Sequence, residues 1–296
     1  MDIKSLRLFS HLAETLHFGR TSEHFHMSPS TLSRHIKHIE AEIGYLLLNR
    51  DNRSVQLTPE GELFYRYANE SLLQWRDFKR LLNTDGEKLV GEISLYCSVT
   101  ASYSFLYDIL SDFRKLHPEI EMKLHTGDPA PALVRVLEGH EDIAIGVRPN
   151  TLPTNMRFKR IAISPMVFII PNTPLHGLPL DLTRVQTHDI DWGQIPMILS
   201  EEGIARTRVD QWFRQKRITP KIYAQVAGNE AIVSMVSLGF GVGVVPKIVL
   251  DNSPLIDKVR ILDVQPELDA FDVGLFTLKK SLATPIINAF WQQVSH

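Results

Sequence analysis

The stretch Phe18-Gly-Arg-Thr-Ser-Glu-His-Phe-His-Met-Ser-Pro-Ser-Thr-Leu-Ser-Arg-His-Ile-Lys-His-Ile-Glu-Ala-Glu42 decides the fold of the N-terminal region, because it predicts two short helices around a tight turn. The second helix has clear start signals. The Ser28 side chain can accept a backbone N–H bond, and the fixed φ of Pro29 suits the first helical position. We therefore expect this helix to begin directly after Ser28.

The expected second helix has two different sides. Apolar residues recur at spacings of four, three and four, which gathers on one helical stripe Leu32, Ile36, Ile39 and Ile43. The opposite side carries the hydroxyl, guanidinium and ammonium groups of Ser30, Ser33, Arg34 and Lys37. Such a helix, preceded by a shorter one, is typical of the recognition half of a helix-turn-helix.

The same periodicity also fits an amphipathic helix of any globular protein, whose Arg and Lys point outward simply because they are charged. The order of charges favours DNA contact. From residue 28 to residue 38 the outward side carries Arg34 and Lys37 without a carboxylate, and Glu40 and Glu42 come only where the helix ends. The N-terminal half is the part that would meet a polyanion.

A basic turn follows this helix. Residues 49–53 lie between the apolar residues 46–48 and the strand-like residues 55–57, which predicts a small β wing. We expect its arginines, Arg50 and Arg53, to reach phosphate or a minor groove.

The first sixty residues resemble the winged helix-turn-helix of LysR-type transcriptional regulators. The matching motifs are Leu6-Arg7-Leu8-Phe9, Ser28-x-x-x-Leu32-Ser33-Arg34-x-Ile36, Glu42-Ile43-Gly44, Arg50 and Leu57-Thr58-x-x-Gly61. Two places depart from the family: Thr21-Ser22 replaces a usual pair of alanines, and Leu47-Leu48 replaces a common Leu-Phe. A buried Ser22 hydroxyl would need a partner, most simply a carbonyl one turn back.

The resemblance implies a homodimeric or homotetrameric regulator that binds double-stranded operator DNA and works with RNA polymerase. We expect base choice to depend mainly on Arg34 and Ser33, and the wing arginines to hold the DNA backbone. The full set of expected DNA contacts is Arg20, Ser28, Ser30, Thr31, Ser33, Arg34, Lys37, Arg50 and Arg53.

A long helix is expected after the wing, because Thr58-Pro59-Glu60 repeats the cap-then-proline start, and it should run to about Asn83. On one side of this helix, residues recur every three or four positions, close to the spacing of a coiled-coil seam: Phe64, Tyr67, Ser71, Trp75, Phe78 and Leu82. In the family this helix pairs two subunits, as a palindromic operator requires. The alternative is that it packs on its own domain. Residues 84–87 then open a hinge.

From residue 90 short apolar runs alternate with helical stretches, which predicts a parallel-rich α/β fold. The expected strands are residues 92–97, 119–125, 142–146, 167–170, 197–199 and 241–245, and the expected helices are residues 101–116, 130–137, 206–216 and 230–238. The resemblance implies two subdomains that close around a small effector, like a type 2 periplasmic solute-binding protein. Crossover strands would join them at residues 162–166 and 267–271.

The expected organisation therefore has three parts. Residues 1–58 form the winged helix-turn-helix, residues 59–89 form the dimerisation helix and hinge, and residues 90–296 form the α/β effector domain. Within the effector domain, we expect subdomain I at about residues 90–163 and 268–296, and subdomain II at about residues 164–267.

Helix starts in the effector domain are the expected ligand site. Ligands of α/β sheets bind beyond the ends of strands, where free N–H groups at helix N-termini favour an anion. The candidate effector-binding residues are Ser98, Thr100, Ser102, Thr126, Arg206 and Asn229. Each has a plain alternative role, since Ser, Thr and Asn cap helices in many proteins.

Three segments, residues 97–103, 126–128 and 229–236, are similar to a LysR-type activator of the acetohydroxy acid isomeroreductase gene in branched-chain (isoleucine-valine) amino acid synthesis. This similarity implies a small anionic co-inducer, acetolactate or acetohydroxybutyrate. Backbone amides and Arg206 would hold its carboxylate, and Ser98 and Thr100 its other oxygens. The alternative is a LysR-type regulator that responds to a different small carboxylate metabolite.

Composition fits a two-part cytoplasmic protein. The chain has 296 residues, of which 44% are hydrophobic, enough for more than one core. No run approaches the roughly eighteen apolar residues of a membrane span, and Met1-Asp2-Ile3-Lys4 does not resemble a secretory signal. The net charge is −2, and residues 1–58 carry seven Lys and Arg against six Asp and Glu. Attraction to DNA must therefore come from local placement of the cations.

Catalytic, metal and cofactor chemistry is not expected. The single cysteine, Cys97, excludes an internal disulfide and a cysteine-based zinc site, and it is expected at a buried strand end. His24-x-His26 lacks further ligands at a usual spacing. The run Gly239-Phe-Gly-Val-Gly243 follows a helix and precedes a strand, the reverse of a dinucleotide fingerprint, and is better explained as a helix C-cap and turn. We expect a non-enzyme.

Overall fold

A computed structural model describes residues 1–50, 54–82, 89–173 and 190–294. The chain divides into two compact units, one of residues 1–87 with 138–140 and one of residues 88–137 and 141–296. No helix in the described residues is long and apolar enough to cross a membrane. The expected hinge at residues 84–87 lies outside the described residues. The boundaries 58/59 and 89/90 stay a prediction.

Three helices form the core of the first unit: α1 (Ile3–Thr15), α2 (Phe18–His24) and α3 (Pro29–Ile43). The apolar side of α3 is buried at Leu32, Ile36 and Ile39, in one cluster with residues of α1. The helix begins directly after Ser28, and it ends at Gly44, whose φ of +83° is the left-handed conformation that glycine adopts without strain. The predicted helix-turn-helix is confirmed.

The two polar residues that replace the usual alanines are both buried in α2. The Ser22 hydroxyl donates to the Gly19 carbonyl at 2.9 Å, as expected. The Thr21 hydroxyl oxygen lies 2.9 Å from the Thr15 hydroxyl oxygen and 2.9 Å from Nδ1 of His11. Each buried hydroxyl therefore has a hydrogen-bond partner, which burial requires.

The wing is an antiparallel pair of short strands, β1 (Leu48–Arg50) and β2 (Val55–Leu57), followed by the long helix α4 (Pro59–Leu82). The Thr58 hydroxyl caps α4, since it accepts the Gly61 N–H at 2.9 Å and donates to the Leu46 carbonyl at 2.8 Å. A Cβ on Gly61 would lie 2.0 Å from the Leu47 carbonyl oxygen. Only glycine lets α4 approach the strand this closely.

The second unit is built on one continuous mixed sheet with the strand order β4-β3-β5-β11-β6-β9-β7-β8, and β10 also pairs with β6. The strands are β3 (Gly91–Cys97), β4 (Ile120–Thr126), β5 (Ile143–Val147), β6 (Met156–Pro171), β7 (Pro196–Ser200), β8 (Lys221–Val226), β9 (Val242–Pro246), β10 (Val259–Leu262) and β11 (Leu268–Leu278). Parallel pairs lie at both ends, β4-β3-β5 in one lobe and β9-β7-β8 in the other. The predicted α/β effector domain is confirmed.

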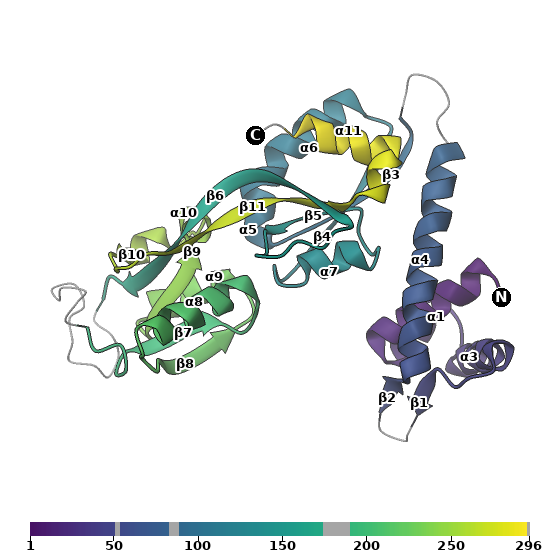
Figure 1. Ribbon diagram of the computed structural model, residues 1–296, viewed down its shortest axis with the longest axis horizontal. Coiled ribbons are helices and arrows are strands. Elements are labelled where there is room, and N and C mark those ends of the chain that lie inside the picture. Colours follow the sequence, from purple (N-terminus) through teal and green to yellow (C-terminus); the bar gives the residue numbers. More distant parts are fainter. Residues whose placement is uncertain (51–53, 83–88, 174–189, 295–296) are drawn as a thin grey trace. The chain divides into compact units, whose positions relative to one another are not determined.

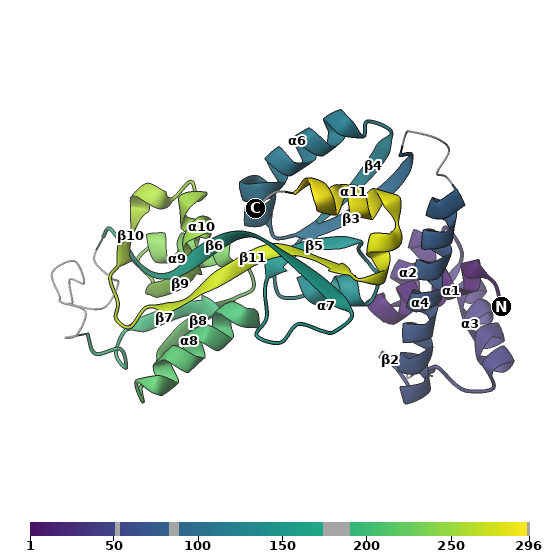
Figure 2. The same cartoon turned by 45° about the horizontal axis from the view of Figure 1, so that its top comes forward.

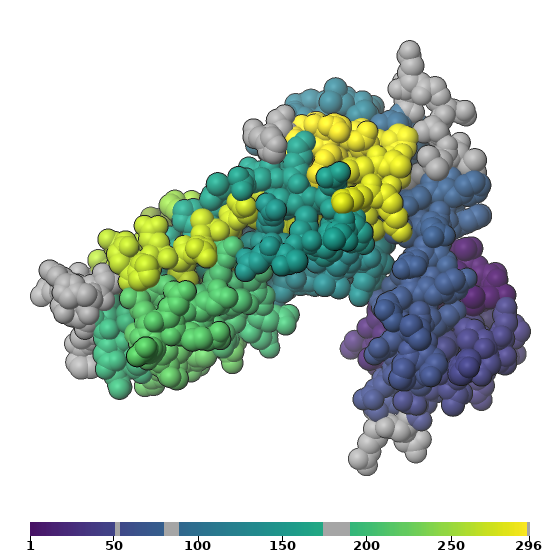
Figure 3. Space-filling model, in the orientation of Figure 1, coloured from purple at the N-terminus to yellow at the C-terminus, as the bar shows by residue number. Residues whose placement is uncertain are grey.

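Two long antiparallel strands, β6 and β11, run side by side from one lobe to the other (Figure 1 and Figure 2). Strand β6 contains the crossover segment expected at residues 162–166, and β11 contains all but the first residue of the one expected at residues 267–271. In the space-filling view they form a continuous band of teal and yellow atoms between the lobes (Figure 3). Strands β3 and β5 on one side and β9 on the other are therefore held in a single sheet.

Helices pack on the sheet at each end (Figure 1). The lobe of β3 holds α5 (Val99–Ala101), the π-helical segment η1 (Ser102–Leu106), α6 (Tyr107–Leu116), α7 (Ala132–Leu137) and α11 (Pro285–Gln293). The lobe of β7 holds α8 (Gly203–Gln215), α9 (Asn229–Ser237) and α10 (Lys247–Asp251). Strands β8 and β10 and helices α10 and α11 were not predicted.

Two smaller expectations are also confirmed. Cys97 is buried at the end of β3, and burial raises the pKa of its thiol to about 11, which makes it a poor nucleophile at neutral pH. Gly239 has a φ of +81° directly after α9 and precedes β9. This segment is a helix end and turn, as its sequence order indicated.

Candidate functional site

Hydroxyl groups gather at the start of α3. The Ser28 hydroxyl oxygen accepts the Thr31 N–H at 3.1 Å, and it lies 2.9 Å from the Ser30 hydroxyl and 2.8 Å from the Thr31 hydroxyl. The α3 N-terminus therefore presents three hydroxyls, two of them within hydrogen-bond distance of Ser28, and its backbone N–H groups give this end a partial positive charge. Such an end can face a phosphate.

The outward side of α3 carries the expected cations. Arg34 and Lys37 are exposed, and neither makes an ion pair within the part of the chain that the structure describes. Arg20 is exposed on α2, where its backbone N–H bonds to Nδ1 of His17 at 3.1 Å. Within the described ranges, none of these three side chains has an ion-pair partner, so each can approach an anion.

Arg50, an expected DNA contact, is exposed but also makes contacts within its own unit. Its guanidinium donates to Oε2 of the buried Glu40 at 2.9 Å and lies over the Phe18 ring, 5.1 Å from the ring centre. Glu40 also accepts the backbone N–H groups of Leu47 and Leu48, at 3.1 and 3.3 Å. This arginine therefore joins the wing to α3, and its expected contact with DNA stays a prediction. The expected contact Arg53 lies outside the described residues.

This ion pair was not predicted, although the sequence holds a signal for it. Glu40 follows Ile36 by four residues, so it belongs to the buried stripe of α3 and not to its solvent side. A carboxylate on a buried stripe needs a cation and hydrogen-bond donors. Arg50 also reaches toward Ser33, whose hydroxyl oxygen lies 3.5 Å from Nη1. Ser33, expected to contact bases, is only partly exposed.

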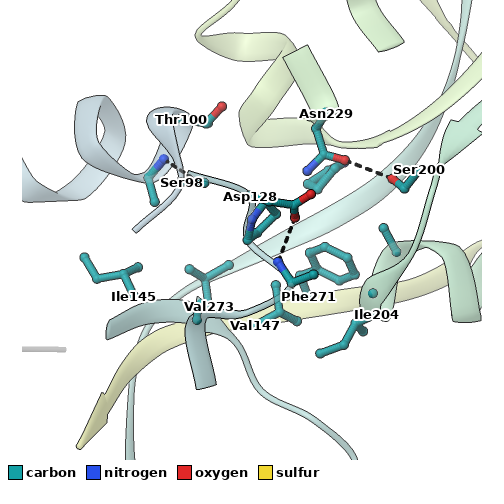
Figure 4. A pocket seen from close by; sticks show the side chains of 18 of the residues that line it. Ser98, Thr100, Asp128, Ile145, Val147, Ser200, Ile204, Asn229, Phe271 and Val273 are labelled. Carbon is teal, nitrogen blue, oxygen red and sulfur yellow. Dashed lines mark hydrogen bonds between the residues drawn. The ribbon is translucent and has the colours of Figure 1, made fainter. Parts of the chain in front are cut away.

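The second unit contains a cavity of about 260 Å³ between its two lobes. Three helix starts converge on it: α5 after β3, α8 after β7, and α9 after β8. Hydroxyl and amide side chains of Ser98, Thr100, Ser200 and Asn229 lie on one side, and Figure 4 shows the apolar side chains on the other. The labelled apolar residues are Ile145, Val147, Ile204, Phe271 and Val273.

The polar side of the cavity is organised by hydrogen bonds. The Ser98 oxygen accepts the Ala101 N–H at 3.1 Å and so caps the first helical turn. The Ser200 hydroxyl donates to Oδ1 of Asn229 at 3.3 Å. Asp128 was not predicted here, and its Oδ1 accepts the Ala130 N–H at 2.8 Å. Three of the expected effector residues, Ser98, Thr100 and Asn229, thus line one cavity.

The other three expected effector residues do not line this cavity. The Ser102 hydroxyl donates to the Val99 carbonyl at 2.7 Å, a bond within the helix. Thr126 is exposed at the end of β4. Arg206 is turned to its own lobe, where it pairs with Asp210 at 2.9 Å and also donates to Gln225. Among the described residues, no Lys or Arg lines the cavity.

Two family models match this chain. The LysR substrate binding domain matches residues 86–296, and the bacterial regulatory helix-turn-helix of the lysR family matches residues 3–62. The chain belongs to the LysR family. This LysR-type protein is a DNA-binding transcriptional regulator and not an enzyme, and its second unit is a domain that binds small molecules.

Curated relatives support this assignment along nearly the whole LysR-type chain, and a solved structure shows the same fold. The transcriptional activator IlvY of Haemophilus influenzae is 42% identical over 98% of this chain and 99% of its own, and IlvY of Escherichia coli K12 is 43% identical over 99% and 98%. The crystal structure of CbnR, a LysR family regulator, has the same fold, with a TM-score of 0.63 and 18% identity over 99% of this chain and 98% of CbnR.

Proposed function

We propose that this regulator activates genes of branched-chain (isoleucine-valine) amino acid synthesis when acetolactate or acetohydroxybutyrate binds its cavity. Each of these acids has one carboxylate, one hydroxyl, one ketone and small alkyl groups. The observation that carries the proposal is the two-sided cavity, with hydroxyl and amide groups opposite aliphatic side chains. The pathway is supported by the 42–43% identity to IlvY proteins.

The proposed site holds the carboxylate without a cation. The Ser98 oxygen accepts the Ala101 N–H, so its own proton is available to donate to a ligand. The Asn229 amide nitrogen has no partner within the described residues, and the first N–H groups of α8 and α9 lack intrahelical partners. Arg206 is no longer part of the proposed site, because its guanidinium is engaged elsewhere.

The proposed DNA interface is the outward side of α3 with the start of the same helix. Arg34 and Ser33 would read bases, and Lys37 with the hydroxyls of Ser28, Ser30 and Thr31 would contact phosphates. Arg20 on α2 and Arg53 in the wing complete the proposed set. Arg50 would position the wing through its ion pair with Glu40.

The proposed assembly is a homodimer or homotetramer in the cytoplasm that works with RNA polymerase. Helix α4 supports pairing, because aromatic side chains along it are left exposed: Tyr67 by 52%, Trp75 by 40% and Phe78 by 49%. A row of exposed aromatic surface on a helix is typical of a docking face. Two paired copies would offer two recognition helices to a palindromic operator.

Calorimetric titration of the full-length chain tests the effector. We expect acetolactate and acetohydroxybutyrate to bind, and Ser98→Ala to weaken binding about tenfold because a hydrogen bond to a charged group is lost. Ser102→Ala is the matched control, since that hydroxyl is bonded within the helix, and it should change affinity less than about twofold. Binding of another small carboxylate with no response to either acid would favour the alternative regulator.

Footprinting on promoter fragments tests the DNA interface. The purified chain should protect a palindromic site upstream of a branched-chain biosynthetic gene or beside its own gene. Arg34→Ala should lose this protection at the same protein concentration. The absence of any protected site at every ionic strength tested would contradict the DNA interface and leave the cavity proposal standing.

A further inference from the structure

At the edge of the cavity, the carboxylate of one residue in one lobe accepts hydrogen bonds from the other lobe. Oε1 of Glu230, on the second residue of α9, accepts the Thr100 backbone N–H at 3.1 Å and also the Thr100 hydroxyl. Thr100 is buried and lines the cavity, next to Ser98. Asn229, the neighbour of Glu230 in the chain, lines the same cavity. Glu230 therefore binds one of the three expected effector residues that line the cavity.

This contact joins two different lobes. Thr100 belongs to α5, which follows β3, while Glu230 belongs to α9, which follows β8. A second bond lies nearby, from Nδ2 of Asn252 to the Ser104 hydroxyl oxygen at 3.0 Å, and Ser104 in turn donates to the Thr100 carbonyl at 2.8 Å. The helical segment that begins at residue 99 is thus attached to the opposite lobe at two points.

The number of donors on Thr100 makes this arrangement exclusive. A threonine has one backbone N–H and one hydroxyl proton to donate, and Glu230 takes both. A ligand carboxylate can only accept hydrogen bonds, so it can use Thr100 only after Glu230 leaves. Two carboxylates close together also repel each other. The effector and Glu230 therefore cannot occupy the Thr100 donors at the same time.

We propose that Glu230 is an internal competitor of the effector carboxylate, which must displace it from Thr100. This inference rests on the proposed binding of a small carboxylate in the cavity, and it adds the Thr100 N–H and hydroxyl to the donors that hold this carboxylate. In the free protein, the Glu230 carboxylate joins the two lobes through Thr100. On binding, the ligand carboxylate takes its place at the Thr100 N–H and hydroxyl. The Thr100 contribution to effector affinity is then the difference between its hydrogen bonds to the ligand carboxylate and its hydrogen bonds to Glu230. An uncharged ligand would gain little by displacing Glu230, because a charged acceptor forms the stronger hydrogen bonds.

The experiment measures acetolactate affinity of the full-length chain by calorimetry in two variants. Glu230→Gln removes the charge, and Glu230→Asp keeps the charge but shortens the side chain so that it no longer reaches Thr100. Because a competitor is weakened in both, each should bind acetolactate about tenfold more tightly, which corresponds to one competing charge-assisted hydrogen bond. Glu201→Gln removes an exposed carboxylate that does not line the cavity, and it should change affinity less than about threefold.

A double-mutant cycle tests whether the gain passes through Thr100. In a Thr100→Val background, which lacks the hydroxyl, Glu230→Gln should tighten binding less than about threefold. Unchanged or weaker binding in both Glu230 variants would overturn the competitor role and indicate a clasp that only holds the lobes together. No binding of either acetohydroxy acid by the unmodified chain would instead overturn the proposed effector, so the two failures are distinguishable.

Discussion

Helix α3 and the cavity of the second unit are both proposed to meet a negatively charged partner, but they are built from different groups. The outward side of α3 presents Arg34 and Lys37, which are exposed and unpaired among the described residues. The cavity has no lining cation within the described chain, and the nearby Arg206 is paired with Asp210.

The difference reflects the two kinds of anion. DNA is a polyanion in salt water, and its affinity depends on free cations that release its counterions. A small acid enclosed among aliphatic side chains can be held by N–H and hydroxyl dipoles, which carry no net charge to desolvate. On these proposals, Arg34 and Lys37 stay available for a long, solvated partner, while Arg206 is held in an ion pair beside a site for a small, enclosed one.

The largest expected effect concerns the one buried acid of α3. Glu40→Ala would leave the Arg50 guanidinium and two backbone N–H groups without their acceptor, and should destabilise the first unit by about 3 kcal/mol. Hydrogen exchange of the α3 amides in the full-length chain measures this loss. Glu23→Ala, at an exposed acid of α2, is the control and should stay within about 0.5 kcal/mol. Equal protection in both variants would show that the ion pair has no structural role.

Arg34→Ala should produce the next largest effect, now on binding and not on stability. We expect a loss of about 1 to 3 kcal/mol in operator affinity and a weaker preference for the operator over sequences changed at one base pair. Fluorescence titration against the operator and its single-base variants measures both. Because Arg34 is exposed and unpaired within the described residues, α3 exchange protection should be unchanged. Equal affinity for operator and random DNA in parent and variant would refute base reading by this residue.

Lys37→Ala should have a smaller effect that is similar for all DNA sequences. Loss of one phosphate contact lowers the slope of log affinity against log salt by about 1 for each bound recognition helix. Titrations at several salt concentrations, with operator and random DNA, measure that slope. A loss confined to the operator would instead assign base contact to Lys37.

The smallest expected effect is at Arg206. Arg206→Met should change acetolactate affinity less than about threefold, since its guanidinium is bonded to Asp210, Gln225 and the Ser200 carbonyl. Calorimetry of the full-length chain measures it, with Ser98→Ala as the comparison. A tenfold or larger loss would show that Arg206 turns into the cavity when the ligand binds, and that the effector site does use a cation.

Periodicity predicted the side of α3 that is buried, since Leu32, Ile36 and Ile39 recur at helical spacing and burial follows directly from it. Capping chemistry predicted Ser28 at the start of α3, and the resemblance to the LysR family predicted the crossover segments now seen in β6 and β11. Strand β8 lacked a comparable signal, because it lies at the edge of the sheet and leaves Ile222 and Tyr223 exposed. A segment whose apolar residues neither alternate regularly with polar ones nor become buried cannot be told from a loop by its sequence.

The sequence could not predict which group each long side chain contacts. Sequence order placed Arg206 at a helix start, but whether its guanidinium turns to the cavity or to Asp210 depends on the fold around it. Asp128 and Glu230 were missed for the same reason, since they reach the cavity region only because β4 and β8 end there. Short side chains at helix starts, Ser98 and Asn229, were predictable because they cannot move far from their backbone.

The order of strands in the effector domain has a consequence for how the chain is made on the ribosome. Of the nine strands described in this sheet, β11 is synthesised last, yet it lies between β5 and β6 in the middle of the sheet. The helix-turn-helix can form as soon as its own residues emerge, while a nascent effector domain keeps an open gap until residue 278 has left the exit tunnel. A messenger truncated before that point would yield a product with a DNA-binding unit and no completed sensor.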